Sequence, residues 1–127
     1  MYLLVFVFMG LFAKGVAAGD VPRMTKEELK SLMDNAQVVI IDVRTDSDWN
    51  ESTLKIKGAL REKPRDAESW ADKYDKTKTY VLYCAWPNEA TSAGTAQQLV
   101  NMGFVKVYAL KGGWHEWVRA EFPTVPK

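Results

Sequence analysis

A single cysteine, Cys84, is the residue of this 127-residue chain best suited to nucleophilic chemistry. The run 79–83 before it is rich in β-branched and aromatic residues and predicts a strand, and a helix is predicted to begin at Ala90. Backbone amides at such a strand–loop–helix junction lack partners and would stabilise a thiolate or a terminal sulfur anion. Because the thiolate is the nucleophile in sulfur exchange, this position suits a persulfide.

Two charged residues, Asp42 and Arg44, follow the apolar run 38–41. An ionised pair beside a core strand usually fixes a loop, so we expect a structural role for both residues rather than a catalytic one.

The elements that must position these residues are predicted by hydrophobic periodicity. The apolar run 38–43 is typical of a central parallel strand covered on both faces. A capping box at 25–28 starts the first helix. Residues 45–65 are polar and irregular, apart from a short strand candidate at 58–60. The other predicted strands are 79–84 and 105–110, and the helices run from 25 to 35, from an Asp66 cap to 74, from 90 to 102 and from 114 to 120.

Strands that alternate with helices imply right-handed crossovers and a parallel sheet. We therefore expect an α/β fold with a mostly parallel central sheet flanked by helices. Ligands of such sheets bind at the carboxyl ends of the strands, which is where Cys84 falls.

Composition limits the function further. The length allows one domain, and 47% hydrophobic with 26% charged residues is typical of a globular protein. A net charge of +1 argues against a general nucleic-acid or anionic-membrane surface, so we expect a small-molecule or protein partner. One cysteine and one histidine cannot fill the usual zinc ligand sets, and we expect no metal and no cofactor.

The N-terminal segment differs from the rest of the chain. Residues 3–13 are apolar and uncharged, and Val16-Ala17-Ala18 follows them. This pattern predicts a secretory signal peptide over 1–18, a folded domain over 19–127, and an exported protein of the periplasm or the extracellular space. The alternative is an uncleaved membrane anchor, although the apolar run is about half of the roughly 20 residues that span a bilayer.

Several motifs, in order from about residue 24 to 125, resemble the rhodanese-like domain family. They are Asp42-Val43-Arg44, Gly58-Ala59, the strand 81–84 that ends in the cysteine, Gly103-Phe104, the Gly-Gly-x-x-x-Trp signature at 112–117, and Phe122-Pro123.

The resemblance implies a single rhodanese-like domain that acts as a sulfurtransferase or sulfur carrier. Cys84 would accept sulfane sulfur from polysulfide, thiosulfate or a protein persulfide and pass it to a thiol or a cyanide-like acceptor. Asp42, Arg44 and Asp48 would support the site, with Arg44 paired to Asp48 to hold the first loop against it. His115 would face solvent. The implied anion cradle consists of the amides of Ala85, Trp86, Asn88, Glu89 and Ala90.

The chain also departs from the family pattern. Cys84 and Gly103 are 19 positions apart, about two more than is usual, so the loop or the helix start must differ. No arginine or lysine stands beside Cys84, and Glu89 is expected to bring a negative charge instead. Thiosulfate, a dianion, would then be a poorer donor than polysulfide or a protein persulfide.

Other functions stay open. One alternative is a catalytically silent binding module on the same fold. A remote one is a phosphatase or arsenate reductase of related fold, which would need an arginine in the loop, whereas the next arginine after Cys84 is Arg119. Trp114 and Trp117 are expected in the core. Trp86 could wall the pocket or contact a partner, or it could fold back onto the core.

Overall fold

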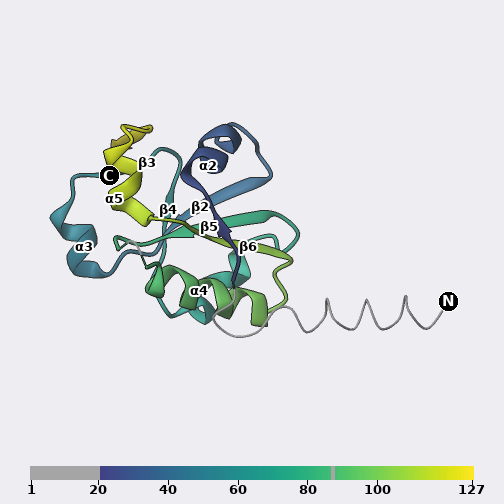
Figure 1. Cartoon of the computed structure of the whole chain (residues 1–127). Coiled ribbons are helices and arrows are strands. Elements are labelled where there is room, and N and C mark those ends of the chain that lie inside the picture. The colour runs from purple at the N-terminus through teal and green to yellow at the C-terminus, as the bar shows by residue number, and fades with distance from the viewer. Residues whose placement is uncertain (1–20, 87) are drawn as a thin grey trace.

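The fold is described from a computed structural model that covers residues 21–86 and 88–127; the predicted signal at 1–18 lies outside the described residues. Its centre is a parallel five-stranded sheet in the order β1-β6-β5-β2-β4 (Figure 1). A separate antiparallel pair joins β3 and β7. The strands are β1 Arg23–Met24, β2 Val38–Asp42, β3 Leu54–Ile56, β4 Leu60–Arg61, β5 Thr79–Tyr83, β6 Lys106–Leu110 and β7 Thr124–Pro126.

Helices cover both faces of this sheet, as predicted. Figure 1 shows α4 below the strands and α2 and α5 above them, with α3 at one end. The α-helices are α2 Lys26–Leu32, α3 Asp46–Glu51, α4 Ala90–Asn101 and α5 Gly113–Arg119, and the short 3₁₀ helices are η1 Ala67–Ser69 and η2 Ala71–Lys73. Among the described residues, no helix is long and apolar enough to cross a membrane.

The two central strands supply a hydrophobic core on each face. Ile41 and Leu82 pack with Leu99 of α4, whereas Ile40 and Val81 pack in a second cluster beneath α2 and α5. Successive residues of a strand point to opposite faces, so burial on both faces requires the nearly continuous apolar runs seen in β2 and β5.

Helix α4 and its cap also match the prediction. Ala93, Ala96 and Leu99 are buried along one side, while Val100 is half-buried. Gly103 follows with φ of +97°, a conformation that glycine adopts without steric cost. The capping box of Thr25 and Glu28 is present at the start of α2 as well.

Residues 45–74 differ from the prediction in three places. The helix predicted over 66–74 is the pair of 3₁₀ turns η1 and η2, and the Asp66 side chain makes no capping hydrogen bond. A hydrogen bond to a distant residue holds this segment instead: the Ala67 amide donates to the Gln98 side chain of α4 at 3.0 Å. Helix α3 and strand β3 lie in the segment expected to be irregular, and the strand expected at 58–60 is β4, at 60–61.

Candidate active site

Cys84 lies directly after β5 and is buried. Its thiol donates a hydrogen bond to Oγ of Ser92 in the first turn of α4, at 3.5 Å. The Ser92 hydroxyl in turn donates to the carbonyl of Glu89 at 3.3 Å. Ser92 did not enter the prediction, although its place in the first turn of the helix after Cys84 was a usable signal.

A cavity of about 410 Å³ opens above Cys84 at the carboxyl ends of β2 and β5, where the prediction put the site. Its walls come from the segment that starts α3 and from the loop that leads into α4. They are Thr45, Ser47 and Asp48 on one side and Ala85, Trp86, Asn88, Ala90 and Thr91 on the other. Among the described residues no lysine or arginine lines this cavity, and Asp48 is its acidic group.

The loop closes partly on itself. The amide of Glu89 donates to the carbonyl of Trp86, and the amide of Ala90 donates to Oδ1 of Asn88, both at 3.2 Å. Two of the five amides of the predicted cradle are therefore already hydrogen-bonded. The amides of Ala85, Trp86 and Asn88 make no hydrogen bond within residues 21–86 and 88–127.

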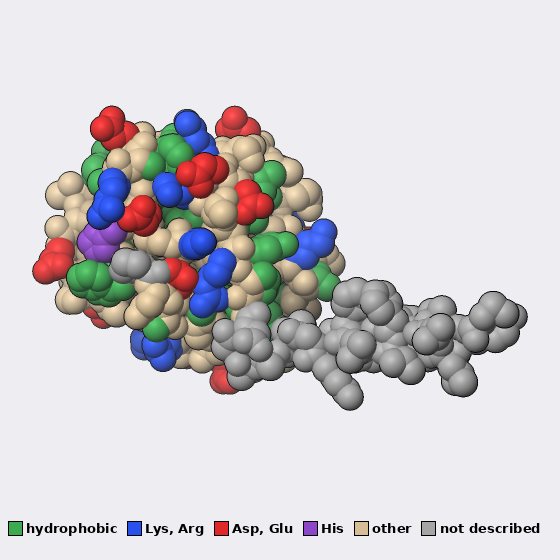
Figure 2. All heavy atoms as spheres, in the orientation of Figure 1, with side chains coloured by type: hydrophobic (Ala, Val, Ile, Leu, Met, Phe, Trp, Pro, Cys, Tyr) green, Lys and Arg blue, Asp and Glu red, His purple; other side chains and the backbone are tan. Residues whose placement is uncertain are grey.

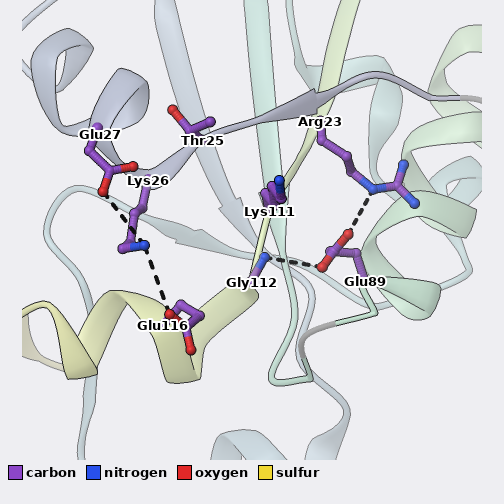
Figure 3. Close-up of a pocket in the computed structure, with 8 residues that line it drawn as sticks. All are labelled: Arg23, Thr25, Lys26, Glu27, Glu89, Lys111, Gly112 and Glu116. Atoms are coloured by element: carbon purple, nitrogen blue, oxygen red, sulfur yellow. Dashed lines mark hydrogen bonds and ion pairs between the residues drawn. The ribbon is translucent and has the colours of Figure 1, made fainter.

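The Glu89 side chain points away from this cavity, contrary to the expectation that its charge would face the ligand. Its Oε1 accepts from Nε of Arg23 at 2.8 Å and its Oε2 accepts from the amide of Gly112 at 3.1 Å (Figure 3). Glu89 has φ of +57°, and this left-handed turn directs its side chain to the opposite side of the loop. Its buried carboxylate therefore ties the start of α4 to β1 and to the turn before α5.

That turn also touches the backbone of the nucleophile. The amide of Trp114 donates to the carbonyl of Cys84 at 2.8 Å. A Cβ atom added to Gly113 would lie 2.5 Å from that same carbonyl oxygen, closer than real Cβ contacts allow. The second glycine of the Gly-Gly-x-x-x-Trp segment, Gly113, is therefore needed because the Cys84 backbone leaves no room for a side chain.

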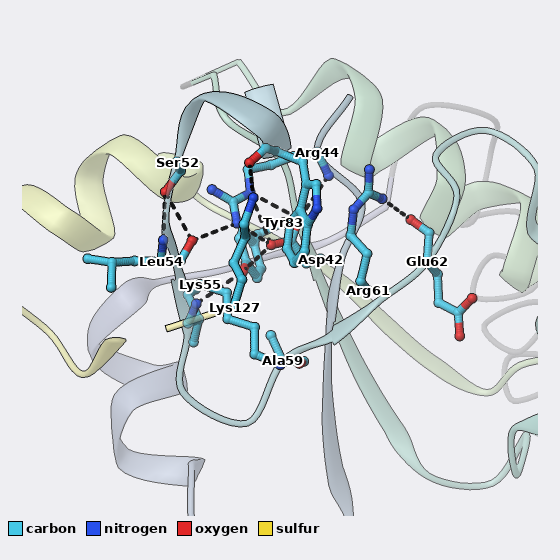
Figure 4. A network of polar contacts seen from close by, with 12 residues as sticks. Asp42, Arg44, Ser52, Leu54, Lys55, Ala59, Arg61, Glu62, Tyr83 and Lys127 are labelled. Atoms are coloured by element: carbon cyan, nitrogen blue, oxygen red, sulfur yellow. Dashed lines mark hydrogen bonds and ion pairs between the residues drawn. The ribbon is translucent and has the colours of Figure 1, made fainter. Parts of the chain in front are cut away.

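Asp42 and Arg44 form a fully buried pair beneath the site (Figure 4). Nη2 and Nε of Arg44 donate to Oδ2 of Asp42 at 2.7 and 3.0 Å, and the Tyr83 hydroxyl donates to the same carboxylate. Nη2 of Arg44 also donates to the carbonyl of Leu54 at 3.0 Å. The expected pairing of Arg44 with Asp48 is wrong: Arg44 lies just beyond the end of β2, where both its amide and its guanidinium donate to the Asp42 carboxylate.

Aromatic rings enclose the Arg44 guanidinium. Its centre lies 4.4 Å from the ring centroid of Trp114 and 5.1 Å from that of Trp49 in α3. Burial, and then the charge of Asp42, raise the pKa of Tyr83 well above its ordinary value. The cluster joins the end of β2 to α3 and α5.

Trp86 walls the cavity and does not fold onto the core, which decides between its two predicted positions. It is 60% exposed, and its ring centroid lies 5.0 Å from that of His115. His115 is exposed, as expected, and does not line the Cys84 cavity. Trp114 and Trp117 are buried, as predicted.

Comparison with known proteins identifies a family and several relatives that this chain resembles. Residues 25–120 match the family described as Rhodanese-like domain. The thiosulfate sulfurtransferase GlpE of Glaesserella parasuis serovar 5 is 31% identical over 100 residues, which cover 79% of this chain and 89% of that protein. GlpE of Coxiella burnetii is 34% identical over 97 residues, covering 76% and 86%.

A solved structure agrees in fold. The polysulfide-sulfur transferase homodimer of Wolinella succinogenes superposes with a TM-score of 0.70 at 24% identity, covering 94% of this chain and 90% of that one.

Proposed function

The chain belongs to the rhodanese-like domain family, and we propose that it is a sulfurtransferase or sulfur carrier that works through a persulfide on Cys84. The observation that carries the proposal is the position of Cys84 at a cavity beside the start of α4, with three loop amides not engaged in the described part of the chain. The GlpE relatives are named thiosulfate sulfurtransferases, which supports the same class of reaction.

The proposed reaction has two displacements at sulfur. The Cys84 thiolate attacks the sulfane sulfur of a donor, and an S–S bond to Cys84 forms as the donor's own S–S bond breaks. The leaving group, which keeps the electron pair, is sulfite from thiosulfate, a shortened polysulfide from polysulfide, or a thiolate from a protein persulfide. An acceptor thiolate or cyanide then attacks the terminal sulfur and leaves Cys84 as a thiolate, so that no external oxidant or reductant is needed.

The residues around Cys84 would stabilise the anion that the reaction carries. Amides of Ala85, Trp86 and Asn88 are available to hydrogen-bond a terminal sulfur anion, and the N-terminus of α4 adds a favourable field. The Ser92 hydroxyl, hydrogen-bonded to Sγ, would orient the thiolate because a hydroxyl can rotate to donate.

The cavity disfavours a dianionic donor for a reason other than Glu89. Asp48 lines the cavity, and no cation among the described residues does. We therefore propose polysulfide or a protein persulfide, rather than thiosulfate, as the better donor.

Thiocyanate production tests the function. The protein is incubated with cyanide and either polysulfide or thiosulfate, with Cys84→Ser as the control. Catalytic thiocyanate formation that requires Cys84 supports the proposal. No Cys84-dependent turnover with either donor would favour the silent binding module. No observation favours a phosphatase, because the described part of the loop has no arginine and Arg119 pairs with Glu116 on α5 at 3.3 Å.

We further propose that residues 1–18 direct export to the periplasm or the extracellular space, with cleavage before Gly19. N-terminal sequencing of protein recovered outside the cytoplasm tests this: a start at Gly19 supports it, and retention of Met1 contradicts it.

A further inference from the structure

A second cavity adjoins the one above Cys84. It measures about 240 Å³, and both cavities are lined by Asp48, Ala85 and Trp86. The second cavity continues to Glu51 at the end of α3 and to His115 on α5. The two adjacent cavities share this wall, and together they are called the docking path.

Trp86 gives this path an apolar wall. Its indole is 60% exposed and tilted 50° against the His115 ring, which limits its motion from one side. An exposed tryptophan that is already ordered is a favourable contact for a protein or peptide, because little side-chain entropy is lost on binding. In Figure 2 the histidine (purple) lies at one edge of the molecule next to hydrophobic side chains (green).

The charge of the path is negative. Helix α3 carries Asp46, Asp48 and Glu51, and Arg61 neutralises only Asp46, at 3.2 Å. Within the described residues, Asp48 and Glu51 make no ion pair, and no lysine or arginine lines either cavity. Helix α3 does receive one lysine contact, from Nζ of Lys127 to the carbonyl of Trp49 at 2.7 Å, but Lys127 lines neither cavity.

We propose that the sulfur acceptor of Cys84 is a protein or peptide cysteine flanked by lysine or arginine, which docks along this path. Basic side chains would face Asp48 and Glu51, and an apolar neighbour of the cysteine would lie against Trp86. The acceptor thiolate then attacks the terminal sulfur of the Cys84 persulfide; the new S–S bond forms on the acceptor as the one to Cys84 breaks, and Cys84 leaves as a thiolate. This inference rests on the proposed function and names its acceptor class.

The test uses the full protein, loaded with sulfur by polysulfide and freed of excess reagent. Short peptides with one cysteine between two lysines, two alanines or two glutamates are added, and discharge of Cys84 is followed by intact mass. At low salt we expect the lysine peptide to discharge Cys84 about tenfold faster than the glutamate peptide, and the ratio to fall as salt rises.

Charge-neutralising variants locate the effect. Glu51→Gln should lower the lysine-to-glutamate ratio, and Glu51→Gln with Asp48→Asn should bring it close to that of free cysteine persulfide. Glu68→Gln, an exposed change in η1, is the matched control and should leave the ratio as it is. Each rate is divided by that for cyanide on the same variant, which corrects for changes in the intrinsic reactivity of the persulfide.

Two negative outcomes are distinct. If Cys84 loads with sulfur and cyanide discharges it, but the three peptides react at equal rates, the docking path is wrong and the proposed function stands. Failure of Cys84 to load at all would overturn the proposed function and this inference with it.

Discussion

Nε of Arg23 in β1 donates a 2.8 Å hydrogen bond to Oε1 of Glu89, the residue that precedes α4. Together with the bond from the Gly112 amide to Oε2, this ion pair holds the loop of Cys84 from the side opposite the cavity. Glu89 therefore does not bring its charge into the cavity, as the sequence suggests, but holds the loop that forms one wall of the cavity.

Removal of the Glu89 carboxylate is expected to weaken both the fold and the site. Glu89→Ala leaves the buried Gly112 amide without its acceptor and should cost about 1–3 kcal/mol of unfolding free energy. Glu89→Gln keeps an acceptor oxygen and should cost less. Urea unfolding measures both, and persulfide loading of Cys84 should slow in the same order. Wild-type stability of Glu89→Ala would show that the clamp contributes nothing.

Gly113 is expected to tolerate no side chain. Gly113→Ala places a methyl group 2.5 Å from the Cys84 carbonyl oxygen, so the nucleophile must shift and sulfur loading should fall. Gly58→Ala is the matched control, because Gly58 also has positive φ but nothing lies within 4 Å of its added Cβ. That control should cost about 1–2 kcal/mol and leave loading unchanged. Equal effects of both changes on loading would reject the close-approach explanation.

Loss of Asp42 is expected to be severe. Asp42→Ala leaves the buried guanidinium of Arg44 uncompensated, which should cost about 3–5 kcal/mol. Asp46→Ala removes an ion pair with Arg61. The Asp46 side chain is 92% exposed, so its loss should cost under about 1 kcal/mol. Thermal and urea unfolding of the two variants provide the comparison. Similar losses for both would mean that the burial of Arg44 does not determine the cost of removing its partner.

Tyr83 gives the protein a predicted sensitivity to alkali. Its pKa is raised in the native state, first by burial and then by Asp42, so the unfolded chain ionises first as the pH rises past about 10. The stabilisation is complete below that pH and is lost above it, at about 1.4 kcal/mol per pH unit. Between pH 9 and pH 11 the wild type should lose about 1 kcal/mol more than Tyr83→Phe. Parallel pH profiles of unfolding free energy would contradict this.

The sequence predicts the parts of this fold that depend on local pattern. Strand β5 and helix α4 follow from the apolar run 79–83 and from the small and apolar residues on one side of 90–102. Strand β3 could not be found in this way, because its pairing partner β7 is far away in the chain, with Leu54 opposite Pro126. Helix α3 has Trp49 as its single large apolar residue and shows no helical periodicity.

Some features of the candidate site could likewise be predicted from the sequence and others could not. The place of Cys84 at a strand end follows from the sequence, and the pairing of Asp42 with Arg44 joins two opposite charges that are only two residues apart in the chain. The direction of the Glu89 side chain could not, because it depends on a left-handed backbone at a residue other than glycine and on contacts with Arg23 and Gly112.

The central claim is that Cys84 carries sulfur, and the intact mass of the protein after brief incubation with polysulfide tests it most directly. We predict one added sulfur atom on the wild type and none on Cys84→Ser, with the added mass removed by cyanide as thiocyanate. A wild-type mass that does not change, or an adduct that persists in Cys84→Ser, would contradict the account.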